Sequence, residues 1–218
     1  NNTETYRAAG FPFARNHDAS YCEEYGVEHC VDITAIFRDF NADVEDPASY
    51  DFTFTDLLLA ALVENKVEPY FRLGVTIENA QRIKAYRIFP PADNEKWAKI
   101  CEHIIRHYNE GWADGFYYHI TYWEIWNEPD NGIDNSQNLM WRGTKEQYYA
   151  LSRVTSRHLR KCFGNTIKIG GYGGSGFYVV DNGDISKYIS AAVGMEQHMQ
   201  KPEFSVWERR TMHFVDFF

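Results

Sequence analysis

Apolar and polar residues alternate along this chain with two different periods. Short apolar runs bounded by Gly, Pro or Asn are typical of buried strands, and apolar residues three and four apart are typical of helices with one buried face. We therefore expect strands at 11–16, 68–74, 120–127, 167–171 and 213–218. Helices are expected between them at 54–64, 94–108, 144–163 and 185–199. This order of strands and helices, with no internal linker, predicts an α/β fold around a parallel sheet.

Capping signals support two of these helices. Asp93 is placed to cap the helix at 94–108, and Thr144 with Gln147 has the spacing of a capping box. The segment 27–50 shows neither period, and we expect a long irregular loop there. A loop of that length commonly shapes a cleft or has a function of its own.

The most informative segment is Tyr-Trp-Glu-Ile-Trp-Asn-Glu-Pro-Asp at 122–130. It is expected to form a buried strand that presents Asn127 and Glu128 at its C-terminal tip, because Pro129 cannot continue the hydrogen-bonded ladder. Glu124 would share the face of Glu128 but lie deeper. A carboxyl group beside an amide and several aromatic rings suits acid/base chemistry on a sugar. The alternative interpretation is an aromatic core strand closed by a polar turn.

Composition restricts the classes of partner. The chain has 218 residues, of which 44% are hydrophobic, so residues 1–218 can form a single domain with a core of ordinary size. The net charge of −9 argues against nucleic acid or an anionic membrane as a partner. No apolar run approaches the length that crosses a membrane.

Cysteine and histidine spacing gives no sign of a disulfide framework or a metal site. Cys101 and Cys162 fall in expected helices, where a reduced thiol is the usual state, and only Cys22 and Cys30 could pair. We therefore expect neither a metal nor another cofactor. The helix histidines are expected to be solvated; they are His103, His107 and His158.

Four separated motifs resemble those of one enzyme family. These are Arg15-Asn16-His17, Tyr50-Asp51-Phe52 with Asp56, the run 123–130, and the strand with its Gly-Gly end at 167–171. In this order they are similar to glycoside hydrolase family 39, the β-xylosidase and α-L-iduronidase family among the retaining (β/α)8-barrel glycosidases. The resemblance spans essentially the whole chain, and the run 123–130 is its most specific part.

The resemblance implies a TIM barrel and a role for each matching residue. Glu128 would be the general acid/base, and Asn127 would bind the hydroxyl next to the anomeric carbon. His17 would contact the sugar, Arg15 would lie beneath the site, and Trp126 would line it. The expected partner is an oligosaccharide or simpler glycoside, and the chemistry needs no cofactor. Two residues have rival interpretations: Arg15 as an ion-pair partner of Asp18 or of a helix carboxylate, and His17 as an ordinary loop histidine.

Two departures from the family pattern complicate this prediction. Arg72 occupies a position where the family's xylosidases usually carry an acidic residue, so it could favour an acidic sugar or neutralise a nearby carboxylate. Only five strands are expected, whereas a barrel has eight. We therefore expect an incomplete barrel, without the strand that bears the nucleophilic Glu, and inactive on its own. The alternatives are a non-catalytic carbohydrate-binding barrel and an inactive structural fragment.

Overall fold

A computed structural model of the chain describes residues 3–16, 33–74, 88–130, 138, 140–171 and 173. Within these ranges the chain forms a four-stranded sheet whose strands follow one another in sequence order. The strands are β1 (Phe13–Arg15), β2 (Glu68–Leu73), β3 (Tyr122–Ile125) and β4 (Lys168–Gly170). All three neighbouring pairs are parallel, which confirms the predicted α/β architecture. The fifth predicted strand, at 213–218, lies outside the described residues.

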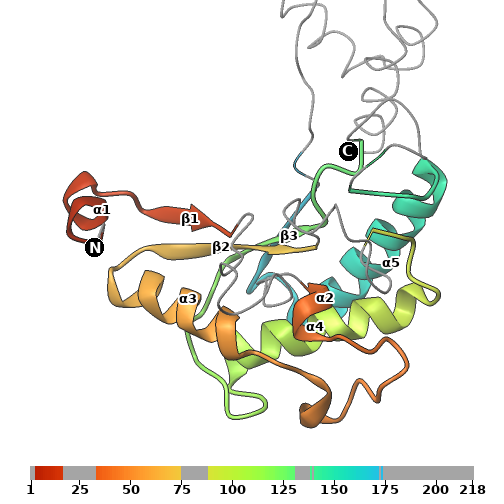
Figure 1. Cartoon of the computed structure of the whole chain (residues 1–218), viewed down its shortest axis with the longest axis horizontal. Helices are drawn as coiled ribbons and strands as arrows, with labels where there is room; N and C mark the ends of the chain where they lie inside the picture. Colours follow the sequence, from red (N-terminus) through yellow and green to blue (C-terminus); the bar gives the residue numbers. More distant parts are fainter. Residues whose placement is uncertain are drawn as a thin grey trace, which may run out of the picture.

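The helices between the strands lie on one side of the sheet, whereas α1 precedes β1 and lies apart at its far end (Figure 1). They are α1 (Thr3–Ala9), α2 (Ile33–Ile36), the 3₁₀ helix η1 (Pro47–Ser49), α3 (Thr53–Glu64), α4 (Asn94–Glu110) and α5 (Lys145–Phe163). The last three match predicted helices within a few residues, and the predicted helix at 185–199 lies outside the described residues. None of the described helices is both long and apolar enough to cross a membrane.

Both predicted helix starts are confirmed. The carboxylate of Asp93 accepts hydrogen bonds from the N–H groups of Glu95 and Lys96, at 2.9 and 3.1 Å. Thr144 and Gln147 form a complete capping box at the start of α5. These caps satisfy N–H groups that the first turn of a helix cannot pair internally.

The segment predicted to be irregular contains two short helices. All four residues of α2 are buried, and η1 begins after Asp46, whose side chain accepts a hydrogen bond from the N–H of Ala48. A single helical turn contains too few residues to show a period of 3.6, so the hydrophobic pattern does not reveal it.

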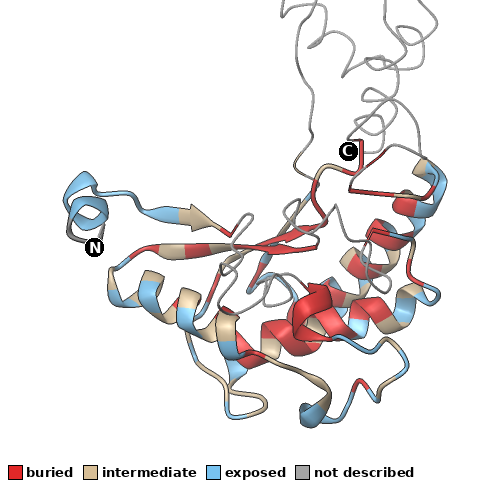
Figure 2. Cartoon of the chain, in the orientation of Figure 1, coloured by how far each residue is buried: buried red, intermediate tan, exposed pale blue. Residues whose placement is uncertain are grey.

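The core lies between the helices and one face of the sheet. Phe71 of β2 and Trp123 of β3 are fully buried and their rings stack, with centroids 4.9 Å apart. Against this face pack Trp97 of α4 and Leu151 of α5, both fully buried. Figure 2 shows the buried residues concentrated where the sheet meets α2, α4 and α5. Because side chains alternate along a strand, the opposite face of the sheet is left to a different set of residues.

Two of the helix histidines are buried rather than solvated, so that prediction was wrong for them. His107 is 2% exposed, stacks on Phe52 with ring centroids 3.6 Å apart, and has its two nitrogens 3.1 Å from Asp56 Oδ1 and 2.9 Å from Trp112 O. His103 is 6% exposed and its Nδ1 lies 2.9 Å from Lys99 O. Buried imidazoles need such hydrogen-bond partners, and helical periodicity cannot reveal them.

Candidate active site

The carboxyl ends of the strands bring several polar side chains together. β1 ends at Arg15, which is in register with Tyr70 of β2, and Tyr70 is in register with Tyr122 of β3. Alternation places Glu124 on the same face of the sheet, two residues further along β3. This face is opposite the one that packs on the helices. Enzymes with parallel sheets of this kind hold their active sites at the carboxyl ends of the strands, where such polar residues gather.

The backbone at the end of β3 is unusual. Trp126 still pairs with β2, since its N–H donates to Leu73 O at 2.7 Å, while Glu128 N–H donates to Gly173 O at 2.9 Å. Trp126 and Glu128 have φ angles of +71° and +42°, which side-chain-bearing residues rarely adopt. Each such residue costs on the order of 1–3 kcal/mol, and such costs are concentrated at functional sites. Glu128 thereby lies at the carboxyl end of the sheet, three residues after the end of β3, where it is half-buried.

Close packing against this turn requires a glycine on the neighbouring strand. A Cβ added to Gly74 would lie 2.8 Å from the Cα of Trp126. Backbone cannot give way as a flexible side chain can, so the end of β2 has to be free of a side chain here.

One arginine links two of the polar side chains. Arg15 Nε donates to Glu124 Oε2 at 2.6 Å, and Arg15 Nη2 donates to Asn127 Oδ1 at 2.7 Å. The side chain of Glu124 is only 4% exposed, and that of Arg15 is 29% exposed. A carboxylate this deeply buried needs a charged or hydrogen-bonded partner. Arg15 is therefore an ion-pair partner, as one of the two interpretations of the sequence held, but its carboxylate comes from a strand.

The contact with Arg15 fixes the orientation of the Asn127 amide. A guanidinium only donates hydrogen bonds, so the amide oxygen must face Arg15 and the amide NH2 group must face away from it. Asn127 is 1% exposed, and its Nδ2 has no hydrogen-bond partner among the described residues. A buried donor without a partner costs about 1–3 kcal/mol. An acceptor on a bound molecule would recover that free energy.

A cavity of about 520 Å³ opens on this face of the sheet. It is lined by Phe13, Arg15, Tyr70, Tyr122 and Glu124. The rings of Tyr70 and Tyr122 stack with centroids 5.8 Å apart, and Phe13 meets Tyr122 edge-on at 5.4 Å. Burial, followed by the negative charge of Glu124, raises the pKa of Tyr70, so its hydroxyl remains a donor at neutral pH. Flat aromatic surfaces beside hydrogen-bonding groups suit the apolar faces of a sugar ring.

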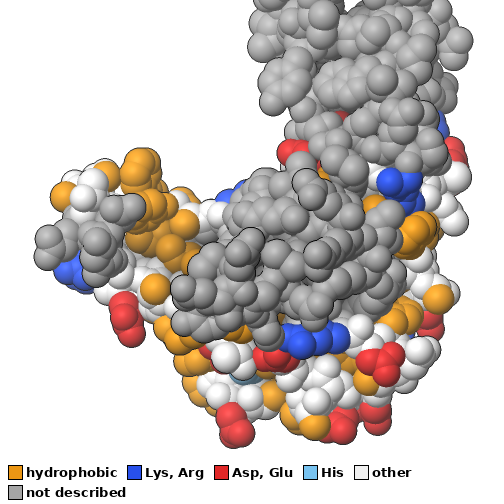
Figure 3. All heavy atoms as spheres, viewed as in Figure 1, with side chains coloured by type: hydrophobic (Ala, Val, Ile, Leu, Met, Phe, Trp, Pro, Cys, Tyr) orange, Lys and Arg blue, Asp and Glu red, His pale blue; other side chains and the backbone are white. Residues whose placement is uncertain are grey.

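The apolar edge of this region is visible on the surface. Figure 3 shows hydrophobic side chains gathered over α1 and the start of β1. There Tyr6, Phe11 and Phe13 are exposed, and the rings of Tyr6 and Phe11 lie 5.1 Å apart. The exposed part of Phe13 connects this patch with the cavity.

Trp126 takes a different place from its predicted one. It is 1% exposed, its indole N–H donates to Met140 O at 2.9 Å, and its ring meets that of Trp141 edge-on at 4.9 Å. This placement favours a packing role beneath the site over direct contact with a sugar.

Arg72 is fully buried and in register with Glu124, with its backbone N–H donating to Asn16 Oδ1 at 2.5 Å.

The structure thus brings Arg15, Asn127 and Glu128 to one edge of the sheet, while the predicted His17 lies outside the described residues. Sequence reasoning missed the roles of Phe13, Tyr70 and Tyr122 in lining the cavity. The signal was available, because the period of two puts these residues on the same face as Arg15 and Glu124.

Comparison with known proteins points to one family. The family model described as glycosyl hydrolases family 39 matches residues 12–204. The β-xylosidase of Caldicellulosiruptor saccharolyticus is 25% identical over 131 residues, which are 56% of this chain and 25% of that protein. This chain therefore spans about a quarter of the length of that β-xylosidase.

One solved structure is similar in fold, and a second gives a weaker match. A glucosidase from Croceicoccus marinus matches with a TM-score of 0.60 and 24% identity, over 86% of this chain and 36% of that chain. The GH39 enzyme from Xanthomonas axonopodis pv. citri matches with a TM-score of 0.45 and 22% identity, over 66% and 28% of the two chains.

Proposed function

The chain belongs to glycosyl hydrolase family 39, and from this premise we propose that it is the part of a retaining glycosidase that carries the general acid/base. The described parallel sheet corresponds to consecutive strands of a (β/α)8 barrel. Coverage of 36% of the Croceicoccus glucosidase chain supports the proposal that further strands belong to the same barrel.

Glu128 is the proposed acid/base. In the first step its carboxylic acid gives a proton to the glycosidic oxygen as the bond from that oxygen to the anomeric carbon breaks. In the second step its carboxylate takes a proton from the water that attacks the glycosyl-enzyme intermediate. Its half-buried position at the edge of the sheet, next to the buried Asn127, gives it access to both substrate and water.

The attacking carboxylate is proposed to come from another strand of the barrel. Retention requires two carboxyl groups about 5–5.5 Å apart on either side of the scissile bond. Glu124, the other carboxylate of β3, is 3% exposed and its Oε2 is held by Arg15. A carboxylate in that position orients Arg15 and is shielded from an anomeric carbon at the edge of the sheet.

The orientation of Asn127 is the single observation that carries this proposal. Arg15 holds its oxygen, so its buried NH2 group is left to donate to an acceptor supplied by a ligand. A sugar hydroxyl next to the anomeric carbon is such an acceptor, and the hydrogen bond strengthens as positive charge develops on the ring. An aromatic core strand closed by a polar turn would not need an amide fixed in this way beside Glu128.

The proposed substrate is a xyloside or a related neutral glycoside. One relative is a β-xylosidase, and the aromatic cavity suits the apolar face of a sugar ring. Arg72 is fully buried at the level of Glu124, which favours neutralisation of charge within the protein over contact with an acidic sugar.

Kinetics of Glu128→Gln in the full-length protein test the proposal. Aryl xylosides with poor leaving groups should be cleaved about 10²–10⁴-fold more slowly, because they need protonation. Glycosyl transfer from activated dinitrophenyl xylosides should be little affected. Glu95→Gln, an exposed position on α4, is the matched control and should leave both rates unchanged.

The leaving-group dependence is the decisive readout. Equal loss on both substrate types would remove Glu128 from the acid role. Binding of xylosides without turnover by the unmodified full-length protein would instead support a non-catalytic carbohydrate-binding barrel.

A further inference from the structure

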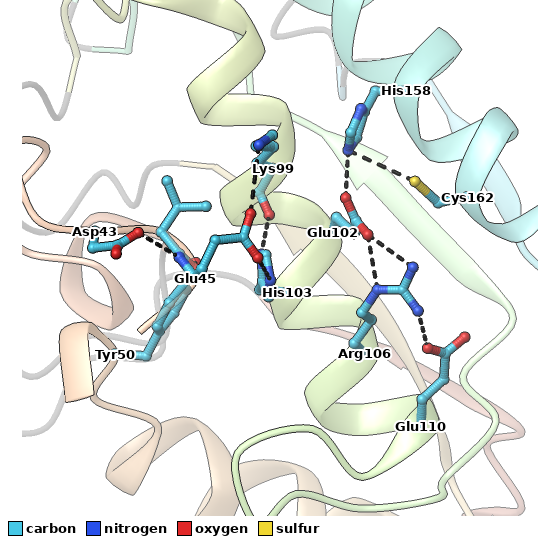
Figure 4. A network of polar contacts seen from close by, with 11 residues as sticks. Asp43, Glu45, Tyr50, Lys99, Glu102, His103, Arg106, Glu110, His158 and Cys162 are labelled. Atoms are coloured by element: carbon cyan, nitrogen blue, oxygen red, sulfur yellow. Dashed lines mark hydrogen bonds and ion pairs between the residues drawn. The ribbon is translucent and has the colours of Figure 1, made fainter. Parts of the chain in front are cut away.

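Three potential metal ligands meet between α4 and α5, outside the sheet. They are Glu102 of α4 with His158 and Cys162 of α5, and one ligand atom of each lies within 4.8 Å of the others. His158 Nε2 is 2.6 Å from Glu102 Oε2 and 3.7 Å from Cys162 Sγ. Figure 4 shows the carboxylate and the sulfur both facing the same ring nitrogen. We refer to these three residues as the interhelix cluster.

Helix geometry explains why the three side chains converge. His158 and Cys162 are four residues apart, so they lie one turn apart on the same face of α5. Glu102 is on α4, the helix that packs against α5. No metal site was expected from the sequence, although a His and a Cys four residues apart on a helix can both reach one metal ion.

The distances within the interhelix cluster are close to those around a tetrahedral metal. Ligand atoms about 2.0–2.3 Å from such a metal are about 3.3–3.6 Å from one another. The N···S distance of 3.7 Å fits this spacing. The O···N distance of 2.6 Å is that of a hydrogen bond, so Glu102 would have to move back by roughly 1 Å to reach the tetrahedral spacing. A rotation about the side-chain bonds of Glu102 supplies such a shift.

The two oxygens of Glu102 have separate partners. Oε1 is held by Arg106, at 2.8 Å, while Oε2 faces the cluster. Carboxylates that bind a metal through one oxygen are commonly held through the other, which fixes their direction. Arg106 is itself paired with Glu110, so its positive charge is already balanced before a cation binds.

The metal-free thiol carries a proton that a bound cation has to displace. Although burial alone would raise it, hydrogen bonds from Arg106 and His158 lower the pKa of Glu102, so it is a carboxylate at neutral pH. Burial, and then the charge of Glu102, raises the pKa of the Cys162 thiol, so the metal-free sulfur keeps its proton. A bound cation would displace the thiol proton into solvent.

We propose that Glu102, His158 and Cys162 form a binding site for a divalent transition metal of the zinc type, with water as the fourth ligand. One nitrogen, one thiolate and one carboxylate suit Zn²⁺ or Co²⁺, whereas Mg²⁺ and Ca²⁺ prefer oxygen alone. Side-chain exposures of 19% for His158 and 15% for Glu102 leave a path from solvent.

The position of the site indicates its effect. α5 starts after the edge that carries Glu128 and ends just before β4, so Cys162 lies toward the opposite edge of the sheet. A metal there would tie α4 to α5 at a distance from the sugar site. It would therefore stabilise the helix pair and leave the glycosidic chemistry to Glu128.

Titration of the reduced full-length protein with Co²⁺ tests this site. We expect one equivalent to bind, with a near-ultraviolet thiolate-to-cobalt band and visible bands of tetrahedral intensity, and Zn²⁺ to abolish both. Cys162→Ser should remove the charge-transfer band. Glu102→Gln and His158→Gln should weaken Zn²⁺ binding by more than the roughly 10–100-fold that loss of an indirect partner costs. The exposed Glu95→Gln and His119→Gln are the controls and should bind as the unmodified protein does.

A second measurement does not depend on a variant folding. Zn²⁺ should slow alkylation of Cys162 by iodoacetamide at least tenfold. The rate is measured by mass spectrometry of the peptide that contains Cys162. A charge-transfer band that persists in Cys162→Ser, or alkylation of Cys162 that Zn²⁺ leaves unchanged, would overturn the assignment.

Discussion

Loss of Arg15 is expected to destabilise the protein more than loss of the charge on its partner Glu124, and Arg15→Met tests this in the full-length protein. Methionine keeps much of the length of the side chain but removes the cation that contacts Glu124 and Asn127. Glu124→Gln removes the charge on the other side of the same ion pair. The two variants delete one interaction, yet they leave different groups behind.

The magnitude follows from burial. The Glu124 side chain is 4% exposed, so Arg15→Met leaves a carboxylate that water hardly reaches. Breaking a buried pair from one side typically costs about 3–5 kcal/mol. The 29% exposure of Arg15 means that water already screens part of the pair. We therefore expect Arg15→Met to lower the free energy of unfolding by about 3 kcal/mol, the low end of this range. In Glu124→Gln the remaining guanidinium can be hydrated. We therefore expect the free energy of unfolding to fall by about 1–2 kcal/mol, the cost of an imperfectly replaced charged hydrogen bond.

Urea denaturation of both single variants and the double variant measures these costs. The double variant should be less destabilised than the sum of the single variants, with a coupling free energy in the range of about 0.5–3 kcal/mol. Arg38, which pairs with the exposed Asp51, provides the matched control. Arg38→Met should cost less than about 1 kcal/mol, because water screens an ion pair at the surface. A cost for Glu124→Gln equal to or above that of Arg15→Met would refute the argument from burial.

Two further predictions concern the site and the chain. Asn127→Ala in the full-length protein should lower kcat and kcat/KM together, because its hydrogen bond strengthens in the transition state; a change confined to KM would mean uniform substrate binding. Residues 1–218 expressed alone should hydrolyse no aryl glycoside and should lack a sharp cooperative melt, since an opened barrel exposes strand edges. Turnover that Glu128→Ala abolishes would show that both carboxylates lie in these residues.

Much of the framework could be predicted from sequence because its signals are local. The strand before Pro129 and the helices started by Asp93 and Thr144 depend on residues within a few positions of one another. The parallel sheet then follows from the order of strands and helices. The strands are shorter than expected, since a hydrophobic run does not show where regular pairing begins and ends: the run at 120–127 gives the strand Tyr122–Ile125.

The details of the candidate site could not be predicted in the same way. The contact between Arg15 and Asn127 spans 112 positions, and no local pattern identifies such a partner. Trp126 illustrates the second limit. An aromatic residue next to a candidate catalytic residue suggests a sugar platform, but the left-handed turn at Trp126 directs its ring to Trp97 and Trp141 in the core.

These contacts connect the stability of the sheet to the chemistry proposed for it. Arg15 compensates the buried charge of Glu124 and, through the same guanidinium, turns the Asn127 amide so that its NH2 group faces away. The guanidinium that compensates the buried charge of Glu124 therefore also orients the amide beside Glu128. A substitution of Arg15 should consequently impair both folding and transition-state binding, whereas a substitution of Glu124 that keeps Arg15 in place should impair folding more than binding.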